Sequence, residues 1–149
     1  MTLTIKEYNK IINNIEEDYK KIDNIHQQYK SKLKKYSSDE IISVNFQSNT
    51  SVEDLKNDFD YFEKWYLKLF KQLKKGIDTY EEAIKDYGNI EDAYNYKNAV
   101  DDISFFLINL IHEQYNSIKD VIIDEELMNI KEYMNCLEDL SKNIESLSK

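Results

Sequence analysis

Residues 103–111 read Ile-Ser-Phe-Phe-Leu-Ile-Asn-Leu-Ile, and this stretch decides the fold. Seven of its nine residues are apolar, and at helical spacing Phe105, Phe106, Ile108 and Ile111 point to all sides of the axis. A helix that is apolar on every side has to be covered on every side. The stretch is shorter than the roughly 20 residues that span a bilayer. It therefore predicts the most buried helix of a bundle, with the other helices packed around it.

The composition predicts an all-α protein. The chain of 149 residues contains no proline and two glycines, Gly76 and Gly88, whereas an all-β fold needs many turns rich in those residues. Its content of 41% hydrophobic and 13% aromatic residues can sustain a core. We expect one domain over residues 1–149, because this length is typical of a single domain.

A long helix is predicted over residues 5–36. Thr4 and Glu7 have the spacing of a capping box, which satisfies free backbone N–H groups at a helix start. Downstream, large side chains recur in steps of three and four residues, at Ile5, Tyr8, Ile12, Ile15, Tyr19, Ile22, His26, Tyr29, Leu33 and Tyr36. This heptad spacing predicts that one face of the helix packs against other helices.

Residues 37–51 break the helical pattern and are predicted to form a loop, because polar residues cluster at both ends. Ile42, Val44 and Phe46 alternate with polar residues, which indicates a short extended segment, but a lone strand has no pairing partner. As the longest connection, this loop is a candidate contact surface. Covering one end of the core explains the segment equally well.

A second long helix is predicted over residues 52–87. A capping box of Thr50 and Glu53 marks its start, and Gly88 acts as its C-terminal cap. The apolar spacing keeps its phase at Val52, Leu55, Phe59, Phe62, Tyr66, Leu69, Leu73, Gly76, Tyr80, Ala83 and Tyr87. This continuity favours one helix with a kink at Gly76. A break at Gly76, with a new start at Thr79, is the alternative.

Two further helices are predicted over residues 89–118 and 124–147. The tight connection at residues 88–89 makes the second and third helices antiparallel. The β-branched residues 121–123 disfavour helix, and the acidic residues 124–126 suit a new helix start. One continuous helix through 118–126 is the alternative, because no glycine or proline marks a break. The predicted fold class is an antiparallel four-helix bundle with long heptad-patterned helices.

The charge distribution favours a basic partner. Of the net charge of −9, a charge of −8 falls on residues 89–149, which contain 13 acidic residues and 5 lysines. A strongly acidic surface repels nucleic acid and anionic lipid. A solvated surface that keeps the protein dispersed is the plain alternative.

The sequence carries no complete pattern for catalysis or for metal binding. Asp23 and His26 have the spacing of half the carboxylate-histidine set of di-iron bundles, but the second pair is missing at His112. Acidic residues around Cys136 keep its thiol protonated. Two glycines are too few for a phosphate-binding loop. We therefore predict no enzyme activity, no metal and no cofactor.

These observations predict a non-enzymatic protein that blocks or sequesters a basic protein, either as an immunity protein against a toxin or as a phage-type inhibitor of a host defence effector such as a nuclease. Tyrosines mixed with carboxylates are common at protein-binding surfaces, so the predicted contact residues are Asp101, Asp102, Asp124, Glu125, Glu126, Tyr94, Tyr115, Tyr133 and Phe46. With no apolar signal core at the N-terminus, we expect the protein in the cytoplasm. A coiled-coil adaptor or secretion partner that self-associates or pairs through the first two helices is the alternative.

Overall fold

The computed structural model describes residues 3–44, 49–85 and 90–148, without the side chains of residues 90–93. These residues are mostly helical, and four α-helices pack against one another. In chain order the elements are α1 (Ile5–Leu33), β1 (Ile41–Val44), β2 (Asn49–Ser51), α2 (Val52–Lys85), α3 (Ile90–Ile118), α4 (Ile130–Glu145) and the 3₁₀-helix η1 (Ser146–Ser148). The prediction of an all-α protein is confirmed.

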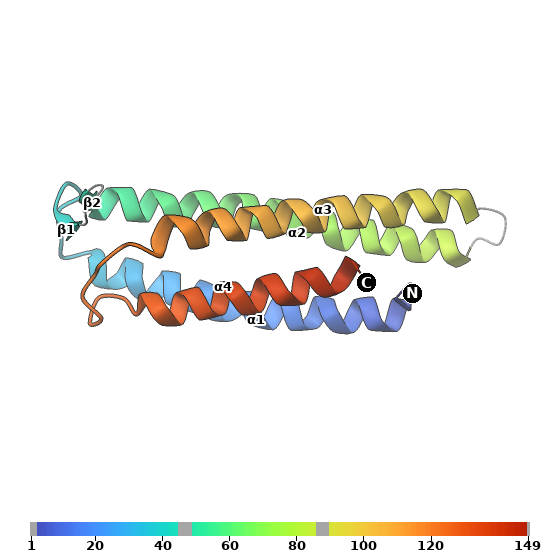
Figure 1. The fold of residues 1–149 in the computed structure, drawn as a ribbon, viewed down its shortest axis with the longest axis horizontal. Coiled ribbons are helices and arrows are strands. Elements are labelled where there is room, and N and C mark those ends of the chain that lie inside the picture. The colour runs from blue at the N-terminus through green and yellow to red at the C-terminus, as the bar shows by residue number, and fades with distance from the viewer. Residues whose placement is uncertain (1–2, 45–48, 86–89, 149) are drawn as a thin grey trace.

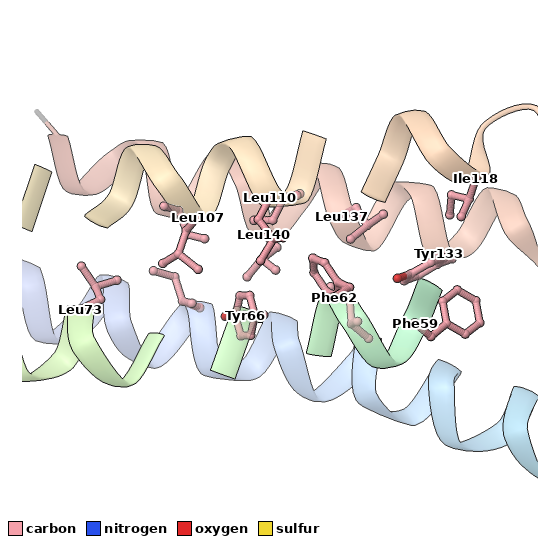
Figure 2. Close-up of a cluster of buried hydrophobic side chains, with 14 of the residues drawn as sticks. Phe59, Phe62, Tyr66, Leu73, Leu107, Leu110, Ile118, Tyr133, Leu137 and Leu140 are labelled. Atoms are coloured by element: carbon pink, nitrogen blue, oxygen red, sulfur yellow. The ribbon is translucent and has the colours of Figure 1, made fainter. Parts of the chain in front are cut away.

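The helices lie along one long axis, and the chain reverses its direction from each helix to the next (Figure 1). The most extensive packing joins α2 to α3, while α4 packs against both α1 and α3. At the end of the molecule where both termini lie, α2 and α3 extend beyond α1 and α4 (Figure 1). The core runs between the helices, where buried side chains of α2, α3 and α4, among them Phe62, Leu107 and Leu137, point into the space between the helices (Figure 2).

The start of α1 follows the prediction, and its end comes earlier. The Glu7 N–H donates to the Thr4 hydroxyl at 3.1 Å, and the Thr4 N–H donates to the Glu7 carboxylate at 3.4 Å, so the capping box is present. Its buried side chains are spaced as the sequence pattern requires, at Tyr8, Ile12, Ile15, Ile22, His26, Tyr29 and Leu33. The helix ends at Leu33 because the chain leaves in a turn, in which the Tyr36 N–H donates to the Leu33 carbonyl.

The connection from α1 to α2 contains a strand pair that the sequence did not predict. β1 pairs antiparallel with β2, with Val44 opposite Asn49 and Ser43 opposite Thr50. The expectation that a strand here lacks a partner was wrong, because its partner is the polar segment just downstream. Since Thr50 belongs to this strand, the capping box of α2 lies one residue later than predicted. The Asp54 N–H donates to the Ser51 hydroxyl, and the Ser51 N–H donates to the Asp54 carboxylate.

Within the described residues α2 is one helix, as the phase of the apolar residues favoured, and it passes through Gly76 without a break. A Cβ atom at Gly76 would lie 3.3 Å from Val100 Cγ2 of α3. The missing side chain therefore lets α2 and α3 approach closely at this point. The predicted final turn of this helix and its cap at Gly88 lie outside the described residues.

The third helix is not covered on every side, which corrects the first prediction from residues 103–111. Leu107 and Ile111 are buried, but Phe105 and Phe106 are 60% and 56% exposed. Two helices, α2 and α4, pack against α3. These two contacts cover part of the circumference of α3, and the remaining side faces solvent.

The last helix begins at Ile130 and not at residue 124, and the alternative of one continuous helix is also wrong. The Asp124 side chain accepts a hydrogen bond from the Glu126 N–H, and its carbonyl accepts from the N–H groups of Leu127 and Met128. These bonds form a turn in place of a helix start. Asn129 caps α4 instead, because its side chain accepts from the Glu132 N–H at 3.0 Å.

Among the helices of the described ranges, none contains a segment long and apolar enough to cross a membrane.

Candidate functional site

Three of the predicted contact residues lie on the first half of α3. Tyr94 is 66% exposed and Asp102 is exposed, while Asp101 is half-buried and forms an ion pair with Lys97 at 3.1 Å. The exposed rings of Phe105 and Phe106 lie on the same helix, with their centroids 6.4 Å apart. We call these five residues, Tyr94, Asp101, Asp102, Phe105 and Phe106, the acidic-aromatic face.

The two phenylalanines were not predicted at the surface, because residues 103–111 were predicted to be buried on every side. A signal was present. Successive residues on a helix point about 100° apart, so Phe105 and Phe106 cannot both share the side of Leu107 and Ile111. A helix that packs against only two other helices leaves its outer side exposed, and the two rings lie on that side of α3.

The predicted acidic group at residues 124–126 does not join the acidic-aromatic face. It lies in the connection beyond the end of α3, and Asp102 is separated from that end by roughly 24 Å of helix. The carbonyl of Glu126 accepts a hydrogen bond from Lys32 Nζ at 2.8 Å, so part of this turn is held against α1. The nine predicted residues therefore do not form one surface, and Phe46 lies outside the described residues.

Tyr115 lines a pocket of about 340 Å³ between α3 and α4. Its hydrogen bond to Glu138 raises the pKa of the Tyr115 hydroxyl, because the carboxylate favours the protonated phenol. In the same pocket Ser141 Oγ lies 3.4 Å from His112 Nε2. Activation of a serine by a histidine needs a shorter contact, of about 2.6–3.2 Å, and Ser141 is buried. The pocket thus presents the polar groups of His112, Tyr115, Glu138 and Ser141 between the two helices.

Tyr133 is fully buried, so it contributes nothing to a surface. Its hydroxyl lies 2.7 Å from His26 Nε2, and His26 Nδ1 lies 2.7 Å from the Glu63 carboxylate. Gln114 Nε2 donates to the Tyr133 oxygen at 3.0 Å. These four residues, His26, Glu63, Gln114 and Tyr133, come one from each helix, and we call them the polar centre.

The hydrogen bonds of the polar centre assign its protons. Because Gln114 donates to the Tyr133 oxygen, the Tyr133 hydroxyl proton is available to donate to His26 Nε2. In this assignment His26 accepts at Nε2 and donates through Nδ1 to Glu63, so each of these groups has a partner. The sequence placed His26 on the packing face of the first helix, and the structure gives it partners from two other helices. A histidine at a heptad position signals buried polarity, but it does not identify the partner.

The rim of the polar centre is charged. Lys30 Nζ lies 2.7 Å from Asp60 and 3.2 Å from Glu63. The hydrogen bond from His26 lowers the pKa of Glu63, and Lys30 adds to this effect, although burial opposes it. Nearby, burial raises the pKa of Asp58, against the hydrogen bond from Ser117.

The lowered pKa of Glu63 predicts a loss of stability in acid. A carboxylate whose pKa is lower in the folded state adds stability above its unfolded pKa, and that stability is lost as the pH falls through the folded pKa. We expect Glu63→Gln to lower the free energy of unfolding by about 1.5 kcal/mol at neutral pH. The difference between the variant and the wild type is expected to shrink once the pH falls below the usual carboxyl pKa of about 4.3, and to vanish only below the lowered pKa of Glu63 in the folded state.

Urea unfolding measured at a series of pH values tests this expectation, with Asp54→Asn on an exposed cap as the control. A difference between Glu63→Gln and wild type that stays constant from neutral to acidic pH would contradict it.

The described residues contain no cluster of three or more histidine, cysteine or acidic side chains that could hold a metal ion. Burial raises the pKa of the Cys136 thiol, and Glu132 adds to the increase. A protonated thiol is a weak nucleophile, so this shift lowers the reactivity of the Cys136 thiol. The acidic-aromatic face is thus the strongest candidate for a functional site.

Comparison of the chain with protein-family models, with curated proteins and with solved structures finds no match.

Proposed function

We propose that this protein is a non-enzymatic binding protein that blocks or sequesters a basic protein partner, such as a toxin or a nuclease effector. One observation carries the proposal: Phe105 and Phe106 are exposed beside Asp101 and Asp102 on one helix. Large exposed aromatic side chains that adjoin one another mark interaction surfaces more often than isolated apolar residues do. Buried aromatic anchors with polar neighbours supply most of the binding energy of protein interfaces.

The packing supports a preformed surface. We propose an antiparallel four-helix bundle with heptad seams, supported by the reversal of chain direction at each connection and by the spacing of buried residues in α1. On such a bundle the acidic-aromatic face keeps its shape without a partner. Binding then costs little conformational ordering, which favours affinity.

The exposed charges of α2 and α3 differ in sign, and this difference favours α3 as the helix that a basic partner contacts. On α2, Lys64, Lys68, Lys71 and Lys75 are all exposed, and their spacing places them on one side of the helix. A basic protein is repelled there and attracted toward the carboxylates of α3. We therefore expect the partner to contact α3, and an exposed apolar residue of α2 serves as the control for substitutions on α3.

Affinity capture from the native host tests the proposal. We expect a basic protein to be retained at low salt and reduced at high salt, because screening weakens the attraction between exposed charges. The double variant Phe105→Ser, Phe106→Ser is expected to lose at least about 2 kcal/mol of binding free energy, measured by calorimetry with the captured protein. Tyr61→Ser on α2, where Tyr61 is 56% exposed, is the matched control and is expected to bind like wild type.

Two results would refute the proposal. One is the absence of any captured partner, and the other is equal affinity of wild type and the double variant. Thermal unfolding of the variants shows whether they fold, since both phenylalanines are mostly solvent-exposed and their replacement leaves the core intact.

A structural adaptor that self-associates is the second candidate. The observation in its favour is the apolar group at the hairpin end, where Ile41, Val44 and Ile122 are exposed, and where the Ile122 N–H joins the two segments by donating to the Ser43 hydroxyl. Light scattering distinguishes the candidates, because the adaptor requires a stable oligomer of the purified protein and the inhibitor does not.

A further inference from the structure

The helix α3 is longer than α4 and extends beyond its end. The fourth helix has 16 residues, whereas α3 has 29 and α1 has 29. These lengths correspond to roughly 24 Å against 44 Å. Part of α3 and part of α1 therefore have no fourth helix beside them among the described residues (Figure 1).

The contacts between α3 and α4 show how far along α3 the fourth helix extends. His112 meets Ser141 of α4, and the two helices run in opposite directions (Figure 1). Phe105 precedes His112 by seven residues, so it lies on the same side of α3 and about 10.5 Å farther along. That position is level with η1, at the end of the fourth helix. Asp101 and Tyr94 continue the same side of α3 beyond η1.

The same reasoning applies to α1. Asn143 of α4 hydrogen-bonds to Asp18 of α1, so Asp18 lies on the side of α1 that faces α4. Ile11 precedes Asp18 by seven residues and Glu7 precedes it by eleven, so both lie on the same side of α1, beyond that contact. Lys97 of α3 lies beside the Tyr8 hydroxyl and opposes the rise that burial causes in the pKa of Tyr8. Tyr8 and Lys97 thus lie close together at this level. We call Glu7, Ile11, Asp101 and Phe105 the uncovered α1–α3 face.

We infer that the uncovered α1–α3 face binds an amphipathic, lysine- or arginine-rich helix of the partner, which takes the place of a fourth helix. This inference rests on the proposed function and specifies the element that the partner contributes. An α-helix fits because its neighbours would be two helices that already accept α4 on the same sides. The distance along α3 from Phe105 to Tyr94 is about 16 Å, which a helix of roughly 11 residues covers.

The charges of the face determine the chemistry of the incoming helix. Within this face Glu7 is exposed and Asp101 is paired with Lys97, so the carboxylates outnumber the lysine by one. The surplus of carboxylates favours a basic polar side, while Phe105 and Ile11 accept an apolar side. A second copy of this chain fits less well, because a symmetric contact through this face would place its carboxylates opposite one another.

Phe105 and Phe106 form a matched pair for the test. Phe106 shares its side of α3 with Ser117, eleven residues later, and Ser117 hydrogen-bonds to Asp58 of α2. Phe106 therefore leans toward α2, whereas Phe105 leans toward α4. The two residues have the same chemistry and almost the same exposure, but only Phe105 belongs to the uncovered α1–α3 face.

The probe is a synthetic amphipathic peptide of about 14 residues with leucine at the heptad core positions and lysine elsewhere. A second peptide with glutamate in place of lysine is the charge control. Binding to the full chain is measured by fluorescence anisotropy. We expect the lysine peptide to bind wild type, Phe105→Ser to weaken binding at least about tenfold, and Phe106→Ser to change it less than about threefold. The glutamate peptide is expected not to bind.

Equal weakening by both serine variants, or binding of both peptides alike, would overturn the inference. So would a self-associated wild type that Phe105→Ser dissociates, as measured by sedimentation. Failure of the peptide test while the captured partner still requires the two phenylalanines rejects the helical element and leaves the proposed function standing. Absence of a captured basic partner rejects the proposed function itself.

Discussion

Leu107→Ala is expected to lower the free energy of unfolding by about 3 kcal/mol, whereas Phe106→Ala is expected to lower it by about 1 kcal/mol or less. The two residues are neighbours in the stretch that decides the fold, but Leu107 is fully buried and Phe106 is 56% exposed. Leu107 points into the core that α2 and α4 also line (Figure 2). Its truncation removes buried apolar surface and leaves a cavity.

Chemical unfolding followed by far-ultraviolet circular dichroism measures both values. Leucine and alanine have similar helix propensities, so the loss at Leu107 reports burial and not helix formation. A phenylalanine that is covered on all sides would cost about 3–5 kcal/mol on truncation. Equal losses at Leu107 and Phe106 would therefore restore the interpretation of α3 as buried all round.

Tyr133→Phe is expected to lower the free energy of unfolding by about 2 kcal/mol, because the change removes one hydroxyl and leaves two buried groups without their partner. Those groups are His26 Nε2 and the amide of Gln114. Tyr29→Phe is the matched control. Its hydroxyl is buried with no hydrogen-bond partner in the described part of the chain, so its removal is expected to be neutral or to add up to about 1 kcal/mol.

The two tyrosines share their surroundings. Each packs edge-on against Phe59, with ring centroids 5.2 Å away for Tyr29 and 5.4 Å away for Tyr133. The difference between the two variants therefore isolates the hydrogen bonds of the polar centre. If both substitutions change stability by the same amount, the hydroxyl of Tyr133 does not bridge the helices as described.

The long helices were predictable because their signals are local. The start of α1 depends on residues three positions apart, and the continuity of α2 depends on a spacing that repeats through Gly76. The hairpin and the start of α4 were not predictable in this way. Polar residues 49–51 resemble a loop until a neighbouring strand supplies their hydrogen bonds. The turn at Asp124 forms through its side chain, which competes with helix formation.

The candidate site was predicted in part. Charge counting led to Asp101 and Asp102, which lie on the exposed side of α3. Composition could not separate Tyr94, which is exposed, from Tyr133, which is buried, because burial depends on which helices lie alongside. Phe105 and Phe106 were predicted as core for the same reason. Apolar content predicts how much surface is buried, while the number of neighbouring helices determines which residues remain outside.

The polar centre has a consequence for how the helices align. In α1 buried apolar residues repeat every seven positions, so sliding that helix by one heptad, about 10.5 Å, would return large side chains to nearly equivalent places. Apolar contacts alone distinguish poorly between such alignments. His26 has no counterpart one heptad away, since positions 19 and 33 are Tyr19 and Leu33. A shifted helix would bury Glu63 and Tyr133 without their partner, so a single histidine selects one alignment of the four helices.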